Sequence, residues 1–222
     1  MRALILCNGE PPSAELLAHH LASTDLVICA DGALDWARAA GARIDAVIGD
    51  MDSVAEATTD AEVLNAGPHE AQNNTDAEKA VLCAIDRGAE QIVLLGATGR
   101  RLDHTLGNVW LAHKYAYQAQ IVVIDEFSEL LVVRGLTVLC TRVGATVSLL
   151  ALEPGTVVRT TGLQWPLDGP LEPGTRGLSN RACGDIVEID VASGAVAVII
   201  VRGEVWTSGG AHPRPGTSVP GA

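Results

Sequence analysis

Aspartate side chains stand in short stretches of the sequence that also carry glycine and small polar residues. Asp50, Asp52, Asp76 and Asp103 each lie in such a stretch. Oxygen ligands without a histidine or cysteine set select a hard cation, and Mg²⁺ held by aspartates commonly bridges to substrate phosphates. Like charges packed together also raise each other's pKa unless a cation neutralises them. If the fold brings these carboxylates together, we expect a magnesium site that handles phosphate groups.

A second set of residues could hold the phosphates themselves. Residues 96–104, with the sequence GATGRRLDH, combine two glycines with two arginines. Backbone N–H groups of such a loop and one guanidinium can cradle a phosphate. The chain has no G-x-x-x-x-G-K-[S/T] and no G-x-G-x-x-G, so neither a P-loop enzyme nor the usual dinucleotide-binding fold is indicated.

These residues must be positioned by the elements around them, and the first half of the chain predicts an α/β domain. Short apolar runs alternate with helical patterns, which favours a mostly parallel sheet with helices on both faces. The polar clusters follow the strand ends, where ligands bind in open α/β sheets. The expected strands are 3–7, 26–30, 46–48, 92–95 and 121–124, and the expected helices are 13–21, 33–40, 75–87 and 105–117.

From about residue 128 the pattern changes to apolar and threonine-rich runs separated by glycine or proline. This spacing predicts an antiparallel β-sandwich or barrel. We expect an α/β domain over 1–126, an all-β domain over 127–207 and a loose tail over 208–222. The expected strands of the second domain are 130–133, 137–140, 146–150, 157–161, 186–191 and 196–201.

Charge and cysteine content limit the function classes. The net charge is −12, and the first 126 residues carry 19 acidic and 8 basic side chains against 8 and 7 in the remainder. Such a balance argues against nucleic-acid and anionic-membrane partners. Five separated cysteines without a C-x-x-C pair favour small buried thiols over a disulfide frame or zinc site. With no apolar run of 18 residues and no signal-peptide pattern, we expect a cytoplasmic protein.

Six motifs occur together in an order that resembles the thiamine pyrophosphokinase family. Singly each is weak, but the match runs from about residue 3 to 202. The resemblance implies an N-terminal nucleotide domain, a C-terminal β domain, and a homodimer with thiamine sites between subunits. It also implies transfer of a diphosphoryl group from ATP to the hydroxyethyl oxygen of thiamine, giving thiamine diphosphate and AMP. The motifs are Asp31-Gly32, 49–53, Thr75-Asp76, 99–108, 162–167 and 177–180.

The resemblance also implies roles for single residues. Asp50, Asp52, Asp76 and Asp103 would bind Mg²⁺ and take part in catalysis. Asp103 and Asp50 are the candidates for the base that accepts the hydroxyl proton. The ATP phosphates fall to Asn8, Gly9, Asp31, Gly32, Gly96, Gly99, Arg101 and His104. Thiamine falls to Gln72, Thr75, Trp165, Ser179 and Asn180. Two positions depart from the family pattern, since it usually has glycine at the place of Ala33 and aspartate at that of Asn73.

Two other functions remain open from the sequence. A pyrophosphokinase acting on another small alcohol, such as a pterin, would keep the acidic loops but would not need the motifs at 162–167 and 179–180. A noncatalytic nucleotide sensor would keep the fold without turnover. Loss of any of the four aspartates would indicate such a sensor, and all four are present.

Overall fold

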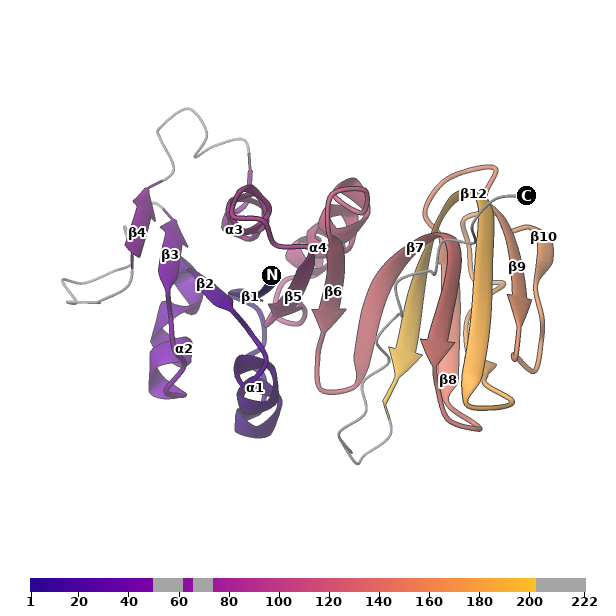
Figure 1. Ribbon diagram of the computed structural model, residues 1–222, viewed down its shortest axis with the longest axis horizontal. Helices are drawn as coiled ribbons and strands as arrows, with labels where there is room; N and C mark the ends of the chain where they lie inside the picture. Colours follow the sequence, from indigo (N-terminus) through magenta and orange to yellow (C-terminus); the bar gives the residue numbers. More distant parts are fainter. Residues whose placement is uncertain (50–61, 66–73, 203–222) are drawn as a thin grey trace. The chain divides into compact units, whose positions relative to one another are not determined.

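The chain folds into two compact units, residues Met1–Glu126 and Phe127–Ala222 (Figure 1). A computed structural model describes residues 1–49, 62–65 and 74–202. The expectation of a mixed α/β fold is confirmed. None of the helices in the described residues is long and apolar enough to cross a membrane.

The first unit is built on a parallel sheet in the order β6-β5-β1-β2-β3-β4, counted over its described residues. The apolar runs form its centre, because strands covered on both faces must be apolar throughout. Leu4 of β1, for example, pairs with Val27 on one side and Val93 on the other. The strands are β1 (Arg2–Leu6), β2 (Leu26–Ala30), β3 (Ala46–Gly49), β4 (Glu62–Asn65), β5 (Gln91–Leu95) and β6 (Gln120–Ile124).

Helices cover both faces of this sheet, with α1 (Ala14–Leu21) and α2 (Leu34–Ala39) on one face and α3 (Asp76–Asp86) and α4 (Leu102–Lys114) on the other (Figure 1). The chain winds outward from β1 to β4 and then returns to β5, beside β1. Right-handed crossovers in opposite directions place the helices on opposite faces. The strand order therefore reverses between β1 and β5, and ligands bind outside the strand ends at such a point.

The N-terminus of α3 forms as its sequence predicts. The Thr75 hydroxyl accepts a hydrogen bond from the Glu78 amide at 3.3 Å, and the stripe Ala77, Ala80, Val81 and Ala84 is buried. The start of α4 was predicted wrongly, because it begins at Leu102 and not near residue 105. Asp103 and His104 therefore belong to the first turn of this helix.

The second unit is antiparallel in every pairing of its described strands. The long strand β12 pairs with β7 along most of its length, with β9 in its first half and with β8 in its second half. The register shifts beyond Val191, near Gly194, whose φ is +80°. The strands are β7 (Ser128–Cys140), β8 (Thr146–Ala151), β9 (Val157–Thr161), β10 (Asp168–Pro170), β11 (Asn180–Arg181) and β12 (Ile186–Val201).

The predictions missed several features of this fold. Four of the expected strands of the second unit are the halves of β7 and β12, since the strand continues through Gly135 and Gly194. The short strands β4, β10 and β11 were not predicted. Cys140 and Cys183 are exposed, so the expectation of buried thiols is wrong for these two. Both cysteines lie at or beyond the ends of strands, where a side chain can remain in contact with solvent.

Candidate functional site

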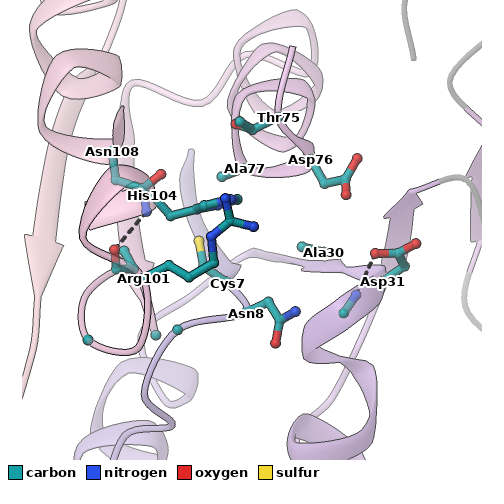
Figure 2. A pocket seen from close by; sticks show the side chains of 15 residues that line it. Cys7, Asn8, Ala30, Asp31, Thr75, Asp76, Ala77, Arg101, His104 and Asn108 are labelled. Atoms are coloured by element: carbon teal, nitrogen blue, oxygen red, sulfur yellow. Dashed lines mark hydrogen bonds between the residues drawn. The ribbon is translucent and has the colours of Figure 1, made fainter. Parts of the chain in front are cut away.

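A pocket of about 160 Å³ lies at the carboxyl ends of β1, β2 and β5, which is where the sheet topology predicts a ligand (Figure 2). We call it the strand-end pocket. The starts of α3 and α4 complete its wall. It brings together ten of the predicted site residues: Asn8, Gly9, Asp31, Gly32, Thr75, Asp76, Gly96, Gly99, Arg101 and His104. Its other lining residues are Cys7, Ala30, Ala77, Ala97 and Asn108.

The loops after β1 and β5 are joined through their backbones at the floor of the pocket. The Gly9 amide donates to the Gly96 carbonyl at 2.6 Å, and the Glu10 amide donates to the Thr98 carbonyl at 2.8 Å. A Cβ on Gly9 would lie 2.3 Å from both of these carbonyl oxygens. Only glycine fits there, so the sequence at residue 9 is set by the close approach of the two loops.

Asn108 holds the loop after β5 through a hydrogen bond to its backbone. It was not predicted as a site residue. Its side chain is buried on α4, and its amide nitrogen donates to the Ala97 carbonyl at 2.7 Å. A buried amide of this kind must find a partner. The signal available in the sequence was that a polar residue, Asn108, falls on the same helix face as the apolar Leu111.

Arg101 reaches into the pocket from the start of α4 (Figure 2). Its guanidinium makes a forked pair with Asp103, with Nε to Oδ1 at 3.1 Å and Nη2 to Oδ2 at 2.5 Å. The hydrogen bond from Arg101 lowers the pKa of the Asp103 carboxyl to about 2, and the same pair raises the pKa of Arg101. Both groups are therefore charged at neutral pH, and the arginine offers its remaining N–H groups to an anion.

The opposite wall of the pocket carries carboxylates. Asp31, directly after β2, and Asp76, at the start of α3, line it, and Asp76 pairs with Lys79 at 2.8 Å. The Asp31 carboxylate lies against Gly49, because a Cβ on that glycine would be 2.2 Å from Oδ2. Asp50 follows directly in the chain. Asp50, Asp52, Gln72 and Asn73 themselves lie outside the described residues.

The structure does not place all four predicted aspartates in one described cluster. Asp103 pairs with Arg101 and does not line the strand-end pocket. Over residues 1–49, 62–65 and 74–202, no group of three or more His, Cys, Asp or Glu side chains is arranged to hold a metal ion. The described carboxylates that face the pocket are Asp31 and Asp76.

Cys7 lines the pocket but has no nucleophilic character. Burial raises the pKa of its thiol to about 12, and burial also raises that of the neighbouring Cys29 to about 12. A thiol with such a pKa stays protonated at neutral pH, and the thiolate is the reactive form. The chemistry of this pocket therefore depends on its carboxylate, amide and guanidinium groups.

A second pocket, of about 290 Å³, lies between α3 and α4 and shares Thr75, His104 and Asn108 with the first. Glu78 lies in its wall and accepts hydrogen bonds from Lys114 Nζ and the Tyr115 hydroxyl, each at 2.7 Å. These contacts tie the start of α3 to the end of α4. Asp103 lines this second pocket.

The remaining predicted residues belong to the second unit. Trp165 and Ser179 are exposed, whereas Asn180 is buried and hydrogen bonded to the backbone of Trp165. Ser179 has a left-handed backbone with φ +57°, and its amide donates to the Ser148 hydroxyl at 2.9 Å. Trp165, Ser179 and Asn180 are thus brought to one turn region of this unit.

Two family models match the chain in succession. Residues 17–124 match the thiamin pyrophosphokinase catalytic domain, and residues 137–196 match the thiamin pyrophosphokinase vitamin B1 binding domain. The chain belongs to the thiamin pyrophosphokinase family. The resemblance of its ordered motifs to this family is therefore confirmed, and a thiamin pyrophosphokinase is a transferase of the kinase type.

Solved thiamin pyrophosphokinases share this fold. The enzyme of Geobacillus thermodenitrificans is 26% identical, with a TM-score of 0.78 over 92% of this chain and 99% of that one. The Bacillus subtilis enzyme is 21% identical, with a TM-score of 0.79 over 90% and 99%. The yeast enzyme is 18% identical, with a TM-score of 0.72 over 90% and 85%. No curated protein sequence matches the chain.

Proposed function

We propose that this thiamin pyrophosphokinase transfers a diphosphoryl group from ATP to the hydroxyethyl oxygen of thiamine and releases AMP. The observation that carries the proposal is the strand-end pocket, most of whose lining residues lie in the segment 17–124 that the catalytic-domain model matches. It has a guanidinium and backbone amides on one side and carboxylates on the other. Phosphoryl transfer depends mainly on this kind of positioning and charge neutralisation.

The cationic side of the pocket would hold the ATP phosphates. Arg101 is oriented by Asp103, and the loop Gly96–Gly99 is fixed by Gly9 and by Asn108. Asn8, Gly32 and His104 also line the pocket and would contact the phosphates. Groups that are already in place lose little freedom when an anion binds, so they favour the geometry of reaction.

The carboxylate side fits a hard cation by the chemistry of its donors, which are oxygens without a histidine or cysteine set. Asp76 and Asp31 line it, and Asp50 follows directly from Gly49, which lies against Asp31. We propose that Asp50, Asp52 and Asp76 hold Mg²⁺. Asp103 belongs to the same proposed site because it orients Arg101. When bound, the ion would neutralise charge that develops on the phosphate oxygens.

In the reaction, the thiamine hydroxyl oxygen forms a bond to the β-phosphorus, and the bond from that phosphorus to the bridging α-phosphate oxygen breaks. The electron pair leaves with AMP, and the hydroxyl proton passes to a base. Asp103 is a poor acceptor because its pairing with Arg101 holds its pKa near 2. Asp50 is therefore the stronger of the two candidates for the base.

The second unit would supply part of the thiamine site. Trp165 and Ser179 expose their side chains in the segment matched by the vitamin B1 binding model, and an aromatic face suits a cationic thiazolium. Gln72 and Thr75 would contact thiamine from the first unit. We further propose a homodimer with shared sites, as the family resemblance implies. The charge and cysteine content favour a cytoplasmic protein without nucleic-acid or membrane partners.

The test is the product formed by the purified full chain with ATP, Mg²⁺ and thiamine. We expect AMP and thiamine diphosphate in equal amounts, separated by chromatography. ADP as the nucleotide product would contradict diphosphoryl transfer and with it both pyrophosphokinase functions. AMP formed equally well with a pterin alcohol would contradict the proposal and support the rival pyrophosphokinase. Binding of ATP without turnover would support a sensor.

A variant pair excludes a contaminating kinase. Asp76→Asn removes a pocket carboxylate and is expected to lower turnover at least ~100-fold, since a charge contact in the transition state is lost. Asp86→Asn is the matched control, because Asp86 is exposed at the other end of α3. It should retain the turnover of the wild type.

A further inference from the structure

Trp165 is the one aromatic residue in the segment 137–196 that matches the vitamin B1 binding model. Its side chain is 55% exposed, in the turn between β9 and β10. Large aromatic side chains usually bury much of their surface. An indole that stays half in water therefore needs something in the turn to hold it there.

The backbone of Trp165 is held on both sides by the side chain of Asn180. The amide nitrogen of Asn180 donates to the Trp165 carbonyl at 2.6 Å, and the Trp165 amide donates to Asn180 Oδ1 at 3.1 Å. The same oxygen accepts from the Arg181 amide at 2.8 Å. The amide and the carbonyl of Trp165 are thus fixed by one side chain.

Asn180 has little left to offer a ligand directly. Its residue surface is only 3% exposed, and its oxygen already accepts two hydrogen bonds, which fills both lone pairs. One N–H of the amide is used by the Trp165 carbonyl. A direct contact to a ligand would require this arrangement to open.

The sequence beside Trp165 restricts the turn further. Pro166 follows it, and a residue before proline is confined to extended conformations. The Gln164 amide also donates to the Arg181 carbonyl at 2.8 Å, which pairs the turn with β11. The backbone from which the Trp165 side chain projects is therefore set before any ligand binds, and such preorganisation favours affinity.

We propose that Asn180 is a positioning residue that acts on thiamine only through Trp165. It fixes the turn so that the indole face stays exposed for a cationic aromatic ligand, and it makes no contact with that ligand itself. This inference rests on the proposed function and assigns Asn180 a role different from the direct contact that the sequence suggested.

A double-mutant cycle tests this role. Thiamine affinity is measured by calorimetry for the wild type, Asn180→Ala, Trp165→Ala and the double variant. We expect each single variant to bind thiamine about tenfold more weakly, since the aromatic face is displaced or lost. The double variant should bind within about twofold of Trp165→Ala alone, because the two residues act as one unit. Losses that multiply in the double variant would mean a direct contact and would overturn the inference.

Two further variants separate positioning from general stability. Thr156→Val removes one buried hydrogen bond in the same unit, from the Thr156 hydroxyl to the Glu153 carbonyl, and should leave thiamine affinity within about twofold. An equal loss in Thr156→Val and Asn180→Ala would overturn the inference. If Asn180→Ala does not fold, Asn180→Asp takes its place, since a carboxylate can keep the two accepted bonds but replaces the donated one by repulsion between its second oxygen and the Trp165 carbonyl oxygen. Its loss of affinity should vanish in the Trp165→Ala background.

The same measurements distinguish this inference from the proposed function. A wild-type chain that binds no thiamine would overturn the proposed function and the inference together. A wild-type chain that binds thiamine while the cycle is additive would overturn the role of Asn180 alone.

Discussion

At the scale of single residues, the strand-end pocket depends on positions where the backbone conformation or a close contact restricts which residue type fits. Arg100 has a left-handed backbone with φ +51°, which is uncommon for a residue with a side chain, and its guanidinium lies 3.4 Å from Asn8 Oδ1. The next residue, Arg101, faces the pocket. Backbone strain persists where the surrounding structure requires it, and such positions cluster at functional sites.

A pair of glycine substitutions tests how tightly the pocket floor is fitted. Gly9→Ala places a Cβ against two carbonyl oxygens and is expected to weaken ATP binding at least about tenfold by separating the loops after β1 and β5. Gly184→Ala is the matched control in the second unit, where a Cβ meets nothing within 4 Å, and it should leave the ATP affinity unchanged. Calorimetry with ATP measures both variants, and unchanged ATP affinity in Gly9→Ala would contradict the close fit.

At the scale of elements, the ends of α3 and α4 connect helix formation to the site. Thr75 caps α3 and lines the strand-end pocket and the pocket between α3 and α4. Arg101 is the N-cap residue of α4, and Asp103 lies in the first turn of this helix. A residue that caps a helix and also lines a pocket contributes to both stability and ligand binding. The two contributions can be separated by comparison with a helix cap that lies away from the pocket.

Two helix caps provide that comparison. Thr75→Ala removes the hydroxyl that accepts from the Glu78 amide, and Ser13→Ala removes the one that accepts from the Leu16 amide of α1. Each should lower the free energy of unfolding by about 1 kcal/mol. Only Thr75→Ala should also raise the KM for thiamine, and Thr75→Ser should restore both quantities. Equal effects of the two alanine variants on KM would show that Thr75 acts through helix stability alone.

The elements also explain how far the sequence could be interpreted. The central strands and α3 were predictable because buried parallel strands are apolar runs and α3 has a threonine at its N-cap and one apolar stripe. The continuity of β12 was not, since Gly194 is equally compatible with a turn and with a bent strand. Ten of the fifteen residues that line the strand-end pocket were predictable from strand ends and family motifs. The pairing of Asp103 with Arg101 and the burial of Asn180 depend on contacts that spacing does not encode.

At the scale of the whole molecule, the chain divides its charge and its proposed tasks between two units. The acidic excess lies in residues 1–126, which hold the strand-end pocket, while the second unit is close to neutral. Magnesium can balance the negative charge of both the acidic loops and the phosphates, whereas a cationic vitamin needs an aromatic face and few basic groups. The two tasks thus have different requirements, which separate units can meet independently.

If the proposed homodimer shares its sites between subunits, two defective chains can restore each other. Asp76→Asn impairs the first unit and Trp165→Ala impairs the second, so a heterodimer of the two would carry one site with both halves intact. Co-expression of the two variants with different tags, and purification of the doubly tagged species, should give roughly half of the wild-type turnover at low thiamine, since one of two sites is whole. A doubly tagged species made from Asp76→Asn and Asp31→Asn is the control and should stay inactive, because both changes lie in the same unit. Sedimentation of the wild type as a fully active monomer, or no gain in the doubly tagged species, would mean that each chain completes its own site.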